Sequence, residues 1–121
     1  MTQEHYQLMT ILKNLVGNAV EAIESTKKSG MIWIREYKKD GNYVFEVADD
    51  GPGISEKDLP NIFDRFFRAD ASRNSAKRGS GLGLAIVKKI ILDHGGNIWA
   101  KSTPGTGTSI YFTLKVKDDT Q

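Results

Sequence analysis

The beginning of the chain carries a strongly one-sided pattern of apolar residues, and this pattern limits the folds that the chain can adopt. Between residues 7 and 25, apolar side chains recur at steps of three and four residues, which predicts a long amphipathic helix. Such a helix needs a second layer to cover its apolar stripe. The stripe consists of Leu8, Ile11, Leu12, Leu15, Ala19, Val20 and Ile23.

Short alternating segments after this helix predict a sheet as the second layer. Ile32 and Ile34 alternate with Trp33 and Arg35, which is typical of a strand. A turn over residues 39–42 and a second strand over 43–48 would complete a β-hairpin. Further strands are expected over 98–101 and 109–116, and a turn at 103–107 would join them. Helices that alternate with antiparallel strands favour helices on one face of a sheet, with the other face fairly open.

Two further helical segments are expected in the second half of the chain. The stronger covers residues 82–93 and ends at Gly95, a residue that suits a helix C-terminus. The weaker is a short helix over 56–60 that begins at Ser55, and residues 61–67 would add another turn or two.

Composition excludes several classes of protein. The chain has 121 residues, enough for one domain with a core. It has no cysteine, which excludes disulfides and thiol catalysis, and its two histidines cannot build a His-rich metal centre. No apolar run approaches the roughly 18 residues of a membrane span, and a net charge of +2 is low for a nucleic-acid binder. We therefore expect a cytoplasmic domain without nucleic-acid or direct membrane contact, and a membrane anchor elsewhere in a longer parent protein remains open.

Glycines are concentrated in three loops. Nine of the 12 glycines lie between Gly51 and Gly107. The loop Asp49-Asp-Gly-Pro-Gly53 follows a predicted strand, where a carboxylate beside glycines can accept a hydrogen bond from an amino group such as that of adenine. The loop that begins at Gly79 directly precedes a helix, and backbone amides at a helix N-terminus suit phosphate. An ordinary Asp-Gly turn and a glycine-rich hinge are the alternative interpretations.

Two other sequence patterns would suit the binding of a metal ion or a phosphate group. Asn14 and Asn18 lie one helical turn apart, and their amide oxygens would suit Mg²⁺ and its waters, although plain surface polarity also explains them. The aromatic segment 62–68 precedes a polar, basic loop over 68–80, whose positive edge would suit a terminal phosphate. A core role for the aromatic rings and a solvated basic loop are the alternatives.

These patterns occur in one order between residues 14 and 108, and in that order the chain resembles the catalytic ATP-binding domain of sensor histidine kinases. The superfamily also contains gyrase, the heat-shock ninety chaperones and the mismatch-repair ATPases. Asn14-Leu-Val-Gly-Asn18 resembles the family's N box, and the glycine loop at 49–53 its first glycine box. Phe63 to Phe67 resembles the F box. The segments 79–84 and 105–108 resemble the two later glycine boxes.

The resemblance implies a fold and a domain organisation. It implies an α+β, two-layer sandwich, the Bergerat ATP-binding fold, in which a mixed, mostly antiparallel sheet of about five strands is covered on one face by about three helices. Residues 1–121 would form a single catalytic domain with an ATP lid at 68–80. The dimerisation and phosphoacceptor domain would be absent.

The resemblance also implies ATP and Mg²⁺ as ligands, and roles for individual residues. Asn18 would coordinate the metal, Asn14 would support the metal and phosphates as a catalytic residue, and Asp49 would accept the adenine amino group. Arg68, the other catalytic position, would approach the γ-phosphate. The nucleotide-binding positions would be Asn18, Asp49, Gly51, Gly53, Ile54, Phe63, Arg68, Arg73, Gly79, Gly81, Leu82, Gly83, Leu84 and Thr108.

The implied activity is transfer of the γ-phosphoryl group to a histidine on a separate helical domain, with a response regulator further downstream. Hydrolytic relatives carry a glutamate at the position of Asn14, and an asparagine cannot act as that general base. Glu21 and Ala22 depart from the lysine and aromatic residue of many kinases, so the phosphate role of position 21 is open. The alternatives are an anti-sigma-factor-type serine kinase and a non-catalytic nucleotide-sensing module.

Overall fold

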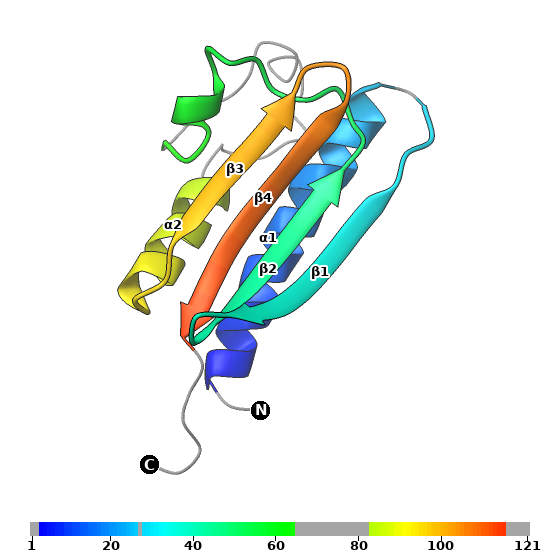
Figure 1. The fold of residues 1–121 in the computed structure, drawn as a ribbon. Coiled ribbons are helices and arrows are strands. Elements are labelled where there is room, and N and C mark those ends of the chain that lie inside the picture. Colours follow the sequence, from blue (N-terminus) through cyan, green and yellow to red (C-terminus); the bar gives the residue numbers. More distant parts are fainter. Residues whose placement is uncertain (1–2, 27, 65–82, 116–121) are drawn as a thin grey trace, which may run out of the picture.

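A computed structural model describes residues 3–26, 28–64 and 83–115 of the chain (Figure 1). In chain order these residues form α1 (Gln3–Ser25), β1 (Ile32–Lys39), β2 (Asn42–Asp49), a short 3-10 helix (Leu59–Asn61), α2 (Gly83–Asp93), β3 (Ile98–Thr103) and β4 (Gly107–Lys115). Neither α1 nor α2, the helices of this described part, is long and apolar enough to cross a membrane.

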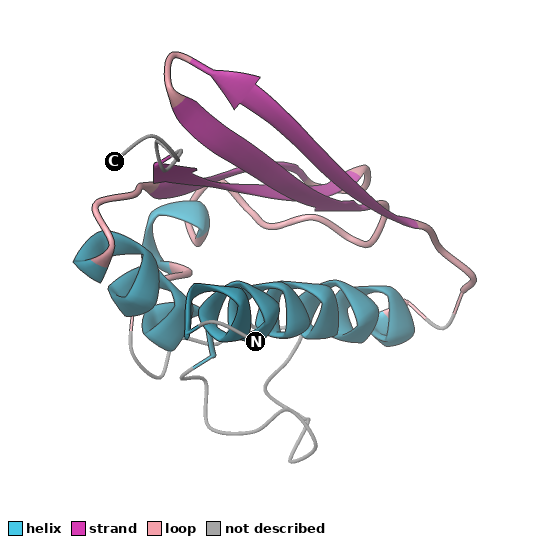
Figure 2. Cartoon of the chain, turned by 90° about the horizontal axis from the view of Figure 1, so that it is seen from below, coloured by secondary structure: helices cyan, strands magenta, loops and turns pink. Residues whose placement is uncertain are grey.

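The molecule has two layers. Four strands form one sheet in the order β1-β2-β4-β3, and every neighbouring pair is antiparallel. Both α-helices lie on the same face of this sheet, as the edge-on view in Figure 2 shows. The α+β class, and the arrangement of helices on one face of an antiparallel sheet, are therefore confirmed.

The β1–β2 hairpin follows from its turn residues. Asp40 and Gly41 have φ angles of 52° and 81°. Positive φ at both central residues is the backbone of the tight two-residue turn that matches strand twist. Lys39 pairs with Asn42 across this turn, and Ile32 pairs with Asp49 at the far end of the hairpin. The turn thus fixes the register that places Asp49 at the end of a central strand.

The core lies between the sheet and the helices. Alternate residues of a strand face opposite sides, and Phe45 and Val47 of β2 face the helices with Ile110 and Phe112 of β4. The rings of Phe45 and Phe112 stack with their centroids 4.8 Å apart. The helices complete the cluster with buried side chains on their apolar stripes, which are Ile11, Leu15, Val87 and Ile91.

The end of α2 has the glycine signal expected from the sequence. Gly95 adopts a φ of 79°, and the N–H of Gly96 donates to the carbonyl of Ile91 at 3.0 Å. This pattern satisfies a carbonyl that the helix would otherwise leave unpaired. The helix therefore ends at Asp93, as predicted, and the chain turns into β3.

The sequence prediction was wrong in some details. Residues 56–60 do not form an α-helix. Ser55 caps a turn by accepting from the N–H of Asp58 at 3.2 Å, and then only a 3-10 turn forms around Pro60, which lacks an N–H for a longer helix. Within the described ranges the sheet has four strands rather than about five and is wholly antiparallel rather than mixed. Two α-helices cover it rather than about three.

Candidate functional site

The first component of the site is a polar stripe along α1. Asn14, Asn18 and Ala22 follow one another at one-turn spacing and so share a side of the helix. The Asn14 side-chain amide donates to the carbonyl of Thr10 at 2.8 Å, which fixes its orientation. Its oxygen is directed at the start of α2, since a Cβ atom on Gly83 would lie 3.5 Å from Asn14 Oδ1. The N box and the beginning of α2 are therefore adjacent.

Asp49 is the second component, at the end of β2. Because it alternates with Val47 and Phe45, its side chain lies on the face of the sheet that the helices cover. Its Oδ1 accepts from the backbone N–H of Gly51 at 2.9 Å, and the backbone N–H of Thr108 also donates to the carboxyl. Burial raises the pKa of the Asp49 carboxyl above its ordinary 3.8, although these two hydrogen bonds oppose the shift.

Asp50, the next residue in the sequence, forms hydrogen bonds with the segment before β1. The Asp50 carboxylate accepts from the backbone N–H of Met31 at 2.7 Å, and the Asp50 N–H donates to the carbonyl of Met31 at 3.3 Å. Asp50 therefore fastens the entry of β1, while Asp49 remains on the helix-facing side. The structure thus separates the roles of two adjacent carboxylates.

The glycine loop after Asp49 is pressed between α1 and the β3–β4 turn. A Cβ atom on Gly51 would lie 3.3 Å from the Cβ of Ala22. Gly53 has a φ of 76°, and a Cβ there would overlap the carbonyl oxygen of Thr103. The N–H of Gly105 donates to the carbonyl of Pro52 at 2.7 Å. Two glycine boxes from distant parts of the sequence therefore pack directly on each other.

Ser102 at the end of β3 is a residue that sequence reasoning missed. Its hydroxyl accepts from the N–H of Ile54 at 2.7 Å and donates to the carbonyl of Gly107 at 2.9 Å. The hydroxyl oxygens of Ser102 and Thr108 lie 2.8 Å apart. A single serine in a strand has no distinguishing pattern, and its proximity to the Pro-Gly-x-Gly turn was the only available signal.

Two predicted site residues contact the hydrophobic core. Phe63 and Leu84 are partly buried and pack against the core cluster. Lys88 Nζ lies 6.0 Å from the centroid of the Phe63 ring. Five of the predicted positions and the lid segment 68–80 lie outside the described residues. These positions are Arg68, Arg73, Gly79, Gly81 and Leu82.

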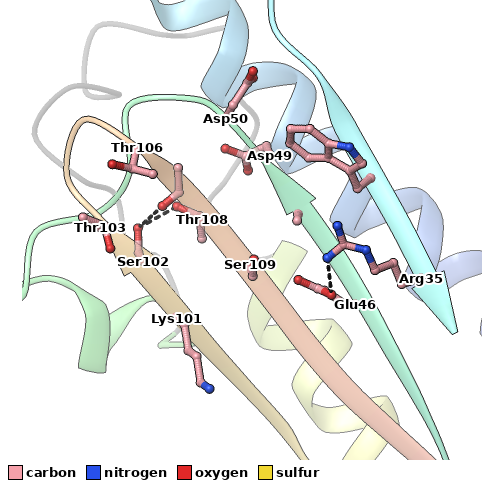
Figure 3. A pocket seen from close by; sticks show the side chains of 13 residues that line it. Arg35, Glu46, Asp49, Asp50, Lys101, Ser102, Thr103, Thr106, Thr108 and Ser109 are labelled. Atoms are coloured by element: carbon pink, nitrogen blue, oxygen red, sulfur yellow. Dashed lines mark hydrogen bonds and ion pairs between the residues drawn. The ribbon is translucent and has the colours of Figure 1, made fainter. Parts of the chain in front are cut away.

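A pocket of about 450 Å³ opens on the outer side of the sheet and at the ends of its strands. Arg35, Glu46, Lys101 and Ser109 line it (Figure 3), and all four alternate with core-facing residues. Arg35 and Glu46 form an ion pair at 3.0 Å. Asp49, Ser102 and Thr108, at the strand ends, also line this pocket, whereas Asn14, Asn18 and Gly83 do not. The pocket therefore meets the predicted site at Asp49 and Thr108, while Asn14 and Gly83 adjoin each other on the helix-facing side.

The donor set on the helix-facing side fits a magnesium nucleotide better than an ion held by the protein alone. No group of three or more His, Asp or Glu side chains that could hold a metal occurs among the residues that the structure describes. Amide oxygens at Asn14 and Asn18 suit a hard cation that takes its other ligands from phosphates and water. The first N–H groups of α2, which begins at Gly83 beside Asn14, have no acceptor within the helix and would suit those phosphates.

Comparison with known proteins gives consistent matches. Residues 4–118 match the family described as histidine kinase-, DNA gyrase B-, and HSP90-like ATPase. The chain is 40% identical over 114 residues to the sensor histidine kinase WalK of Bacillus subtilis, covering 93% of this chain and 18% of WalK. The mycobacterial sensor histidine kinase MprB superposes with a TM-score of 0.77 at 32% identity, covering 91% of this chain and 72% of that structure.

A second solved structure is that of full-length ShkA in complex with AMPPNP, with a TM-score of 0.76 at 31% identity. The match covers 93% of this chain and 22% of the ShkA chain. The present chain thus spans only about a fifth of the length of WalK and of ShkA.

Proposed function

The chain belongs to the histidine kinase-, DNA gyrase B-, and HSP90-like ATPase family, as a homologue of sensor histidine kinase catalytic domains, and on that premise we propose that it binds Mg-ATP between α1 and the sheet. In this proposal its two layers are those of the Bergerat ATP-binding fold. It passes the γ-phosphoryl group of ATP to a histidine on a separate helical phosphoacceptor domain, and a response regulator receives the phosphoryl group afterwards.

One observation supports this proposal above the others: three sequence-distant boxes meet along one side of α1. Asn14 adjoins Gly83 at the start of α2, and Ala22 adjoins Gly51 beside Asp49. Asn14 and Ala22 are eight positions apart, which is about 12 Å along the helix axis. An extended nucleotide can therefore span from the carboxylate at one end to the α2 N-terminus at the other, with Asn18 between them.

Each end of this groove suits a different part of the nucleotide. The Asp49 carboxylate would accept from the exocyclic amino group of adenine, with Gly51, Gly53 and Ile54 backing the base. The N–H groups of Gly83 and Leu84 would hold phosphate oxygens. Arg68, Arg73, Gly79, Gly81 and Leu82 are proposed as further phosphate contacts on the resemblance, with 68–80 as the lid.

Asn18 would hold Mg²⁺ through its amide oxygen, and Asn14 would steady that region. When bound, the metal neutralises charge on the phosphates, which together with positioning is most of what phosphoryl transfer requires. Asn14 is a neutral amide and cannot take a proton from water. The site is therefore suited to hold ATP until the histidine of the partner domain enters, and a chain of this kind acts where cytoplasmic ATP is available.

A phosphotransfer assay tests the proposal. The chain is incubated with Mg²⁺, γ-labelled ATP and the helical phosphoacceptor domain of a related sensor histidine kinase. We expect label on the partner that is lost in acid and stable in alkali, as phosphohistidine is. Acid-stable label on a serine-bearing partner would support the serine-kinase alternative. ATP binding without transfer to any supplied partner would favour the nucleotide-sensing module.

A further inference from the structure

Ser102 stands at the junction of the two glycine loops that enclose the base end of the proposed site. Its hydroxyl contacts three groups: the N–H of Ile54, the carbonyl of Gly107 and the hydroxyl of Thr108. The three contacts are 2.7, 2.9 and 2.8 Å long, so all are within hydrogen-bond range. Ser102 is partly buried, and nothing in the proposed function above uses it.

The proton count at Ser102 fixes the direction of each bond. A serine hydroxyl has one hydrogen and two acceptor lone pairs. The N–H of Ile54 can only donate and the carbonyl of Gly107 can only accept, so the Ser102 hydrogen goes to Gly107. All three bonds coexist only when the Thr108 hydroxyl donates to the second lone pair of Ser102. Thr108 then has no hydrogen left and presents only an acceptor oxygen.

Together with the strand pairing, these hydrogen bonds connect both ends of the loop that follows Asp49. Thr108 pairs with Asp49 across β2 and β4, and with Ser102 across β3 and β4. The backbone N–H of Thr108 donates to the Asp49 carboxyl, which also accepts from Gly51. The residue pair Ser102 and Thr108 therefore holds the loop at its beginning, through Asp49, and at its end, through Ile54.

We propose that Ser102 is a positioning residue that fixes the glycine loop at Ile54 and turns the Thr108 hydroxyl so that it faces the nucleotide as an acceptor. This inference rests on the proposed function. With Ser102 in place, the Asp49 carboxylate and the Thr108 oxygen are two adjacent acceptors. They favour a base edge with an amino group, as in adenine, and disfavour a carbonyl oxygen, as in guanine. Without Ser102 the Thr108 hydroxyl regains a hydrogen to donate.

The test compares Ser102→Ala with a matched control at the other end of the sheet. Thr113 in β4 accepts from the N–H of Asn97 at 3.0 Å through its hydroxyl, so Thr113→Val also deletes one hydroxyl that anchors a loop amide. Both variants should lose stability in urea unfolding, and Ser102→Ala should lose more, because Ser102 makes three partly buried contacts and Thr113 one exposed contact. Only Ser102→Ala should also expose the amide of Ile54 to faster hydrogen exchange.

Binding of Mg-ATP and Mg-GTP to the full chain then separates positioning from general loosening. We expect Ser102→Ala to weaken the binding of Mg-ATP roughly five- to twentyfold, because the buried partners of the lost hydroxyl are left unsatisfied. The fold-loss in GTP affinity should be at least about three times smaller than the fold-loss in ATP affinity. The ratio of ATP to GTP affinity therefore decreases. Ser102→Thr retains the hydroxyl and should restore the preference, and Thr113→Val should keep it.

Three outcomes would overturn the inference. The first is an ATP affinity of Ser102→Ala within twofold of Thr113→Val, and the second is an equal loss of ATP and GTP affinity. If Ser102→Ala does not fold, Ser102→Cys, whose thiol is a weak donor and acceptor, must still show a narrower preference than Ser102→Thr. The third is the absence of saturable ATP binding by the wild type, which would refute the proposed function and this role with it. Saturable wild-type binding beside either of the first two outcomes refutes the role of Ser102 alone.

Discussion

Replacement of Asp49 by asparagine should weaken ATP binding strongly without weakening the fold. In the structure, Oδ1 of Asp49 is occupied by the N–H of Gly51 at 2.9 Å. An asparagine can keep that bond with its own oxygen, but its NH₂ group then occupies the place of the second carboxylate oxygen. A donor would face the adenine amino group, which is also a donor.

The size of the effect follows from the bond that is lost. A hydrogen bond to a charged group contributes about 1.5–3 kcal/mol. Its loss corresponds to a roughly 10- to 150-fold weaker Kd for Mg-ATP. Isothermal titration calorimetry of wild type and variant measures this directly.

The stability of the fold should respond differently from ATP binding, because the buried Asp49 carboxylate does not favour the folded state. Burial raises the pKa of Asp49 above 3.8 in the folded state, so the folded chain binds this proton more tightly than the unfolded chain does. The ionised carboxylate therefore costs stability, and this cost develops as pH rises from 3.8 through the folded pKa and is constant above it. Asp49→Asn lacks this pH-dependent component. We expect the unfolding free energy of the variant in urea to fall less between about pH 4 and pH 7 than that of the wild type.

Asp50→Asn is the matched control, since Asp50 fastens Met31 rather than the site. It should leave the Kd for ATP within about twofold, while any loss of stability belongs to the β1 entry. Equal ATP affinities of wild type and Asp49→Asn would refute the adenine assignment. The same fall of stability with rising pH in Asp49→Asn as in the wild type would contradict the effect of burial on the Asp49 pKa.

Three other substitutions test separate parts of the structure. Gly53→Ala should destabilise the chain by more than about 1 kcal/mol in urea unfolding, because φ is 76° and the new Cβ would overlap Thr103 O; an unchanged midpoint would contradict the loop geometry. Asn18→Ala should weaken ATP binding at least about tenfold in the presence of Mg²⁺, whereas in EDTA the affinity of the variant should stay close to that of the wild type. Because alanine favours helix, its thermal midpoint should not fall, and equal losses with and without Mg²⁺ would exclude the metal role. Val87→Ala, at a fully buried position of α2, should cost about 1–3 kcal/mol of unfolding free energy, and a cost near zero would contradict the described core.

The helices and the hairpin were predictable because each depends on local pattern. The stripe from Leu8 to Ile23 has the helical period, and α1 extends only a few residues beyond its predicted start. Asp40-Gly41 specifies its turn by backbone preference alone. Gly95 marks the end of α2 for the same kind of reason. These signals do not require knowledge of the rest of the chain.

Long-range contacts were not predictable in the same way. Asp49 and Asp50 have different roles because their side chains face different sides of β2. Asp50 also accepts a hydrogen bond from Met31, which lies 19 residues away in the sequence. Ser102 acquires its role from Ile54, 48 residues distant, and from its partner across the sheet. The helix expected over 56–60 did not form because local propensity was outweighed by Pro60 and by the loop's attachment to β3. Tertiary packing decided each of these cases.

Binding of Mg-ATP on the helix-facing side is tested most directly by a titration that reports both faces of the sheet at once. Both tryptophans, Trp33 and Trp99, lie on the outer face, since they pair in register with Ala48 and Tyr111. Amide chemical shifts are followed together with the two indole signals during addition of Mg-ATP. We expect saturable shifts at 51–54, at Thr108 and at the start of α2, with little change at either indole. Saturation with the largest shifts at Trp33, Arg35 and Glu46, which lie on the outer face, or no saturation, would contradict it.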